Sequence, residues 1–98
     1  MYLFDDYALD EHRFELRRGG DLVHVEPRVF DVLAYLIRHR SRVVPKEELL
    51  DEVWGHRCVS ESVLQTAISE LRTALGDDAR QPRFIETVSR RGYRFIAV

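Results

Sequence analysis

The 98-residue sequence has one cysteine, no long apolar run and no export signal, and each shortage excludes a class of protein. The single Cys58 cannot form a disulfide within the chain, which fits a reducing compartment. The longest apolar run, residues 32–37, is far too short to cross a bilayer. The first residues lack the basic and apolar segments of a secretory signal. We therefore predict one cytoplasmic domain over residues 1–98.

Residue patterns for catalysis and metal binding are also missing. Of the four histidines, only His56 lies near a cysteine at metal-ligand spacing, and no second ligand pair accompanies it. The sequence has no Gly-rich phosphate loop and no serine-centred elbow. We predict that the domain is not an enzyme, has no catalytic residues, and binds neither a metal nor a cofactor.

Hydrophobic periodicity predicts an α+β fold in three parts. Loose alternation over residues 1–25 predicts a small N-terminal antiparallel β-sheet. Residues 26–76 have the apolar spacing of three helices. Residues 84–98 contain two β-prone runs, which predict a C-terminal hairpin.

Helix boundaries are marked by single residues. Pro27 suits the first turn of the first helix, and Gly55 follows the second. Ser60 is a favourable N-cap for the third helix, which we expect to end at Gly76. In the hairpin, Gly92 supplies the positive φ that a tight turn needs.

The third helix has an unusual polar face. At about 100° per residue its apolar side chains share one sector, and the other side carries short hydroxyls, an amide and one guanidinium. Such groups suit base edges in the major groove of DNA, although a solvated face of weak helix formers is the simpler interpretation. The polar residues are Ser62, Gln65, Thr66, Ser69, Arg72 and Thr73.

Charge is distributed unevenly along the chain, although the formal net charge is only −2. Residues 79–98 contain five arginines and one acid, whereas residues 1–26 contain seven acids and three arginines. Arg90 and Arg91 stand together at the predicted hairpin tip, where folding does not require two like charges. A phosphate backbone would attract them, but arginines that only maintain solubility would give the same composition.

Four motifs, in order along the chain, resemble the C-terminal effector domain of OmpR/PhoB-type transcriptional regulators, the output domain of many two-component systems. The resemblance spans nearly the whole chain and implies a winged helix-turn-helix, with the third helix in the major groove and the hairpin as a wing in the minor groove. The motifs are EPRVFDVL (26–33), VVPKEELLDEVWG (43–55), ISELRTALG (68–76), and IETV (85–88) followed by RGYRF (91–95).

The resemblance assigns roles beyond the third helix. Lys46, Trp54 and Thr87 match residues that contact the DNA backbone, and Arg90 and Arg91 match the wing tip. The loop made by His56, Arg57, Cys58 and Val59 matches a segment with which many relatives contact RNA polymerase. Ser69 and Glu70 stand where relatives often carry basic groups, which predicts modest affinity for each domain.

The resemblance also implies a longer protein. A DNA-binding module that begins at Met1 is similar to the subgroup in which a sensor, membrane or repeat region follows, so a membrane-tethered full-length protein is one expectation. Binding to direct repeats is another, with an isolated domain that is monomeric or weakly self-associating. We predict sequence-specific binding to double-stranded DNA, and keep a winged helix used mainly for protein–protein association as the alternative.

Overall fold

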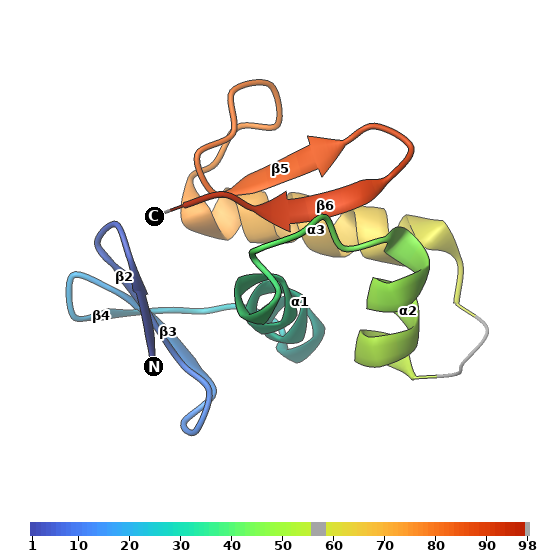
Figure 1. Ribbon diagram of the computed structural model, residues 1–98. Coiled ribbons are helices and arrows are strands. Elements are labelled where there is room, and N and C mark those ends of the chain that lie inside the picture. Colours follow the sequence, from blue (N-terminus) through green and yellow to red (C-terminus); the bar gives the residue numbers. More distant parts are fainter. Residues whose placement is uncertain (56–58, 98) are drawn as a thin grey trace.

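The structure is a computed structural model that describes residues 1–55 and 59–97 (Figure 1). A four-stranded sheet precedes three helices and a hairpin, which confirms the predicted fold class. Within the described residues no helix has both the length and the apolar character needed to cross a membrane. The elements are β1 (Tyr2–Phe4), β2 (Tyr7–Asp10), β3 (Glu15–Arg18), β4 (Asp21–Val23), α1 (Pro27–Arg38), α2 (Lys46–Trp54), α3 (Glu61–Leu75), β5 (Ile85–Val88) and β6 (Gly92–Phe95).

The N-terminal sheet is antiparallel, in the order β1-β2-β3-β4. Alternation places Leu9 and Leu16 opposite each other on the inner face, where both are buried. On the outer face Leu3 and Leu22 stay exposed. The hydroxyl of Tyr7 donates a hydrogen bond of 2.9 Å to the carbonyl of Leu75, which joins this sheet to the end of α3.

The helix ends lie where the sequence predicts them. Pro27 is the first residue of α1, and Gly76 ends α3 in the left-handed conformation with φ 64°. Ser60 precedes α3 with extended backbone, but its hydroxyl does not cap the helix. It lies instead 2.6 Å from the hydroxyl of Ser62, and both side chains are exposed.

The wing hairpin differs from the predicted turn. Arg90, not only a glycine, has positive φ (62°), and Gly92 is already the first residue of β6, with φ 148°. A Cβ at Gly92 would lie 2.0 Å from the carbonyl oxygen of Val44. Val44 pairs with Tyr93 through backbone hydrogen bonds of 2.8 and 3.0 Å, so the link between α1 and α2 adds a bridge to the hairpin. This close approach requires a glycine.

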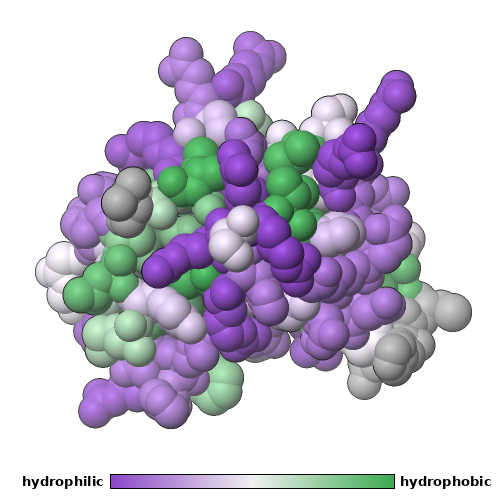
Figure 2. Space-filling view, in the orientation of Figure 1, coloured by the Kyte–Doolittle hydropathy of each residue, from purple (hydrophilic) through white to green (hydrophobic). Residues whose placement is uncertain are grey.

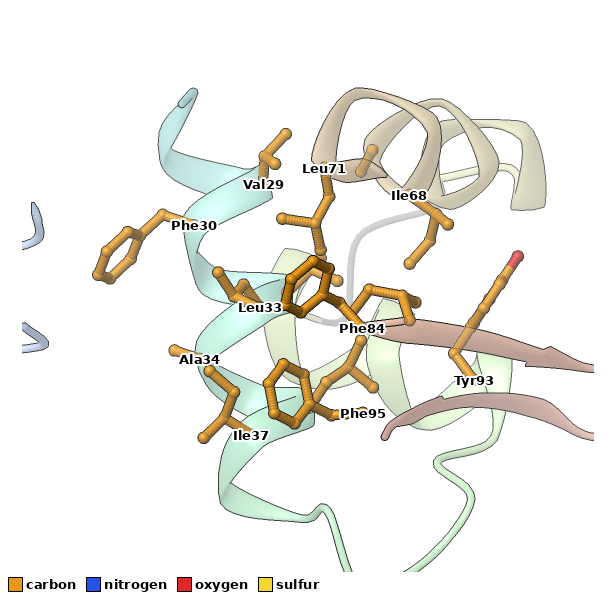
Figure 3. Packing of buried hydrophobic residues seen from close by; sticks show 14 of the residues in the cluster. Val29, Phe30, Leu33, Ala34, Ile37, Ile68, Leu71, Phe84, Tyr93 and Phe95 are labelled. Carbon is orange, nitrogen blue, oxygen red and sulfur yellow. The ribbon is translucent and has the colours of Figure 1, made fainter. Parts of the chain in front are cut away.

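The core lies between α1, α3, the inner face of the N-terminal sheet and the hairpin. In Figure 3 the ring of Phe84 lies between Leu33 of α1 and Leu71 of α3, and the ring of Phe95 of β6 lies beside Ile37 of α1. Phe4 of β1 packs edge-on against Phe84 and Phe95, with ring centroids 5.7 and 5.1 Å apart. The wing is therefore held by the body of the domain rather than projecting as an isolated ribbon.

Candidate nucleic-acid interface

The polar face of α3 is exposed, as an interface with a large ligand requires. Ser62, Gln65, Thr66, Ser69 and Thr73 are all exposed. Part of this face opens into a groove of about 450 Å³ beside the hairpin. The groove is lined by Gln65, Ile68, Ser69, Arg72, Thr73, Asp77, Asp78, Ala79 and Tyr93. The fold thus brings four of the predicted base-contacting residues together, while Ser62 and Thr66 lie outside the groove.

Arg72 is held by the wing. Its Nη2 donates two hydrogen bonds of 2.8 Å, one to the carbonyl of Ile85 and one to Oγ1 of Thr87. Its Nε is buried and has no partner among the described residues. A bidentate contact to guanine needs two N–H groups on one edge of the guanidinium. Only Nη1 therefore remains for a base while this bridge persists.

Asp77 fixes the segment between α3 and the wing. Its carboxylate accepts backbone N–H groups from Arg83, Phe84 and Ile85 at 2.7, 3.2 and 2.9 Å. Burial favours a raised pKa for Asp77, but the donated backbone N–H groups outweigh it and hold the pKa below its ordinary value. The side chain therefore stays ionised and fixes where β5 begins.

Lys46 lies beside the start of α3. Its Nζ is 2.6 Å from Oε1 of Glu61, the first residue of α3. The Lys46 side chain is 28% exposed and that of Glu61 is 51% exposed. The hydrogen bond to Glu61 raises the pKa of Lys46 above its ordinary value. The position of Lys46 fits the predicted contact with the DNA backbone, but its ammonium group already has an anionic partner in Glu61.

The remaining predicted contacts lie on α2, on β5 and in the segment between α2 and α3. Trp54, the last residue of α2, is half-buried against the core, and Thr87 is exposed on β5. Of the loop predicted to contact polymerase, His56, Arg57 and Cys58 lie outside the described residues, and Val59 is half-buried.

The wing tip carries positive charge that no ion pair of the described residues engages. Arg90 and Arg91 are exposed, and none of the ion pairs found within residues 1–55 and 59–97 includes either of them. By contrast, Arg94 on β6 pairs with Glu86 across the hairpin at 2.8 Å. Hydrophilic side chains project in Figure 2 from the corner that the hairpin tip occupies in Figure 1. The tip is thus free to meet an anionic surface.

Sequence reasoning missed two acids of this surface. Glu61 pairs with Lys46, and the Asp77 carboxylate accepts three backbone N–H groups. The spacing of Glu61 from Gln65 and Ser69, at i+4 and i+8, could have placed it on the polar face. Nothing local in the sequence indicates that Asp77 accepts N–H groups six to eight residues further on.

Three helices with a polar third helix beside a two-stranded wing define the class of winged helix-turn-helix proteins. The model of the family described as "Transcriptional regulatory protein, C terminal" matches residues 20–95. The chain belongs to this family, which is the OmpR/PhoB type that the sequence motifs predict.

Known relatives agree with this assignment. The chain is 37% identical over 83 residues to the transcriptional activator CadC of Escherichia coli K12, covering 84% of this chain and 16% of CadC. It is 35% identical over 94 residues to the regulatory protein KdpE of Mycobacterium tuberculosis H37Rv, covering 95% of this chain and 42% of KdpE. The chain therefore spans less than half the length of either relative.

A solved structure places this fold on DNA in a relative. The DNA-binding domain of Klebsiella pneumoniae RstA, in complex with the RstA box, superposes with a TM-score of 0.85 at 31% identity. The match covers 97% of this chain and 95% of the RstA domain.

Proposed function

We propose that this domain binds double-stranded DNA in a sequence-specific manner, as the effector domain of a bacterial transcriptional regulator. The observation that carries the proposal is the exposed polar face of α3 beside a wing whose tip presents two unpaired arginines in the described structure. A helix of this kind fits the major groove, and a hairpin beside it reaches the adjacent minor groove. The RstA domain, which has the same fold, is in complex with the RstA box, and this supports DNA binding by the present domain.

Contacts to bases and to phosphates are then divided along the surface. Gln65 offers an amide for adenine, while Thr66, Ser69 and Thr73 offer hydroxyls for bases or phosphates. Ser62 would reach the groove edge, and Arg72 would donate to a base through Nη1 alone. Lys46, Trp54 and Thr87 would contact the backbone, and Arg90 and Arg91 would enter the minor groove.

The regulator as a whole is a further proposal. The relatives are longer than this chain, so a sensor or regulatory domain of the same protein is expected, and a membrane tether is one form of it. Binding of one domain to each half of a direct repeat would compensate for modest affinity per domain. A contact between the 56–59 loop and RNA polymerase would connect DNA binding by this domain to the regulation of transcription.

Selection of binding sites from random duplexes, followed by a salt titration on the enriched site, tests the proposal. We expect one enriched motif and a log K that falls linearly with log salt, by about 0.9 for each phosphate contact. Enrichment of no motif together with salt-independent binding would overturn the proposal and favour protein–protein association.

A further inference from the structure

Glu61 lies on the same stripe of α3 as the groove-lining residues. Positions 61, 65 and 69 are separated by four residues each, so their side chains follow one another along one side of the helix. Gln65 and Ser69 line the groove. A carboxylate on this stripe would face the negative backbone of any duplex that the helix enters.

Lys46 neutralises this carboxylate, and the same contact occupies Lys46. The two groups approach to 2.6 Å, and the lysine side chain is less than one-third exposed. Neither group has another charged partner among the described residues. A phosphate that approached Lys46 would compete with Glu61 for the ammonium.

We propose that Glu61 restrains Lys46 and thereby lowers the affinity of the domain for DNA of any sequence. Glu61 is then a positioning residue, which acts on the duplex through Lys46. The inference depends on the proposed DNA-binding function. Because a lysine–phosphate contact carries no sequence information, releasing Lys46 strengthens binding to random and to selected duplexes alike.

A double-mutant cycle on a random-sequence duplex tests the restraint, with binding measured by fluorescence anisotropy over a range of salt. We expect Glu61→Gln to raise affinity about eightfold at about 0.1 M salt and to steepen the log K–log salt slope by about 0.9, the effect of one added phosphate contact. In a Lys46→Ala background the same substitution should raise affinity much less and leave the slope unchanged, because it then relieves only the repulsion between the carboxylate and the duplex. Lys46→Ala should weaken duplex binding less in the wild-type domain than in the Glu61→Gln variant, where Lys46 is free to contact phosphate.

Glu47→Gln is the matched control, because it removes the same charge from the first turn of α2, next to Lys46, without breaking an ion pair of the described structure. An equal gain from Glu61→Gln with and without Lys46 would show general repulsion and overturn the restraint. A change of preference at one base position would also overturn it, since Glu61 would then read a base. Absence of duplex binding by the wild type would overturn the proposed function itself, whereas binding without coupling would overturn the restraint alone.

Discussion

Nη2 of Arg72 lies 2.8 Å from the hydroxyl of Thr87, and this contact connects α3 to the wing. The same nitrogen donates to the carbonyl of Ile85, so both of its hydrogens are used. The bridge leaves Arg72 half-buried between α3 and β5. Helix and wing therefore meet a ligand as one unit, with their relative angle set before binding.

Replacement of Arg72 by alanine should lower the free energy of unfolding by about 1.5–3 kcal/mol, because two hydrogen bonds from a charged donor are lost and the Ile85 carbonyl loses a partner. Urea unfolding followed by circular dichroism measures this loss. On DNA, discrimination at one base position should fall by less than the roughly 1–3 kcal/mol of a bidentate contact, since only Nη1 is available.

Arg91→Ala serves as the control for stability. Because Arg91 is exposed, this substitution should change the free energy of unfolding by about 0.5 kcal/mol or less. If Arg72→Ala kept full stability and lost a complete bidentate preference for guanine, the bridge would have to open on DNA, and the base-contacting role predicted from the sequence would stand.

Local signals made the fold predictable, while tertiary contacts hid parts of the site. Pro27 and Gly76 mark helix ends through their own backbone preferences, so their roles could be predicted from the sequence. The partners of Arg72 lie 13 and 15 residues away, and Glu61 meets Lys46 only because α2 and α3 pack together. No local pattern encodes such pairs. Arg72 and Lys46, which the sequence predicts as DNA contacts, therefore prove to have partners within the protein.

The wing-tip arginines should supply a large share of the electrostatic attraction to DNA. We expect Arg90→Asn combined with Arg91→Ala to reduce the log K–log salt slope by about 1.8, if each arginine neutralises one phosphate. Asparagine is chosen at position 90 because it tolerates the left-handed backbone found there, with φ 62°. Salt titration by anisotropy on the selected duplex measures the slope.

The paired control is Arg13→Ala with Arg28→Ala, which removes the same charge from the turn between β2 and β3 and from α1. An unchanged slope in the tip variant, or an equal reduction in the control, would contradict the assignment of the wing tip to DNA.

Gly92 should tolerate no side chain. A Cβ there would lie 2.0 Å from the Val44 carbonyl oxygen, so Gly92→Ala must break the bridge between the α1–α2 link and β6. We expect a loss of about 3 kcal/mol or more in the free energy of unfolding, which combines backbone strain with overpacking. Gly76→Ala is the comparison, because its φ of 64° is also left-handed but a Cβ there meets nothing within 4 Å. That variant should lose only about 1–2 kcal/mol, the cost of a left-handed backbone for a residue with a Cβ, and equal losses in both would show that steric contact at Gly92 is unimportant.

Glu48 should make the domain sensitive to acid. Hydrogen bonds from Arg42 and from the Tyr35 hydroxyl lower the pKa of Glu48 from 4.5 to about 2. Because the folded pKa lies below the unfolded value, this carboxylate stabilises the fold fully above pH 4.5, and the contribution disappears as the pH falls toward 2. Thermal unfolding between these pH values should therefore show a steeper fall of Tm for the wild type than for Glu48→Gln. Glu47→Gln, which changes an exposed acid on the same helix, should keep the wild-type slope. Parallel curves for the wild type and Glu48→Gln would show that the contacts of Arg42 and Tyr35 with Glu48 do not persist in solution.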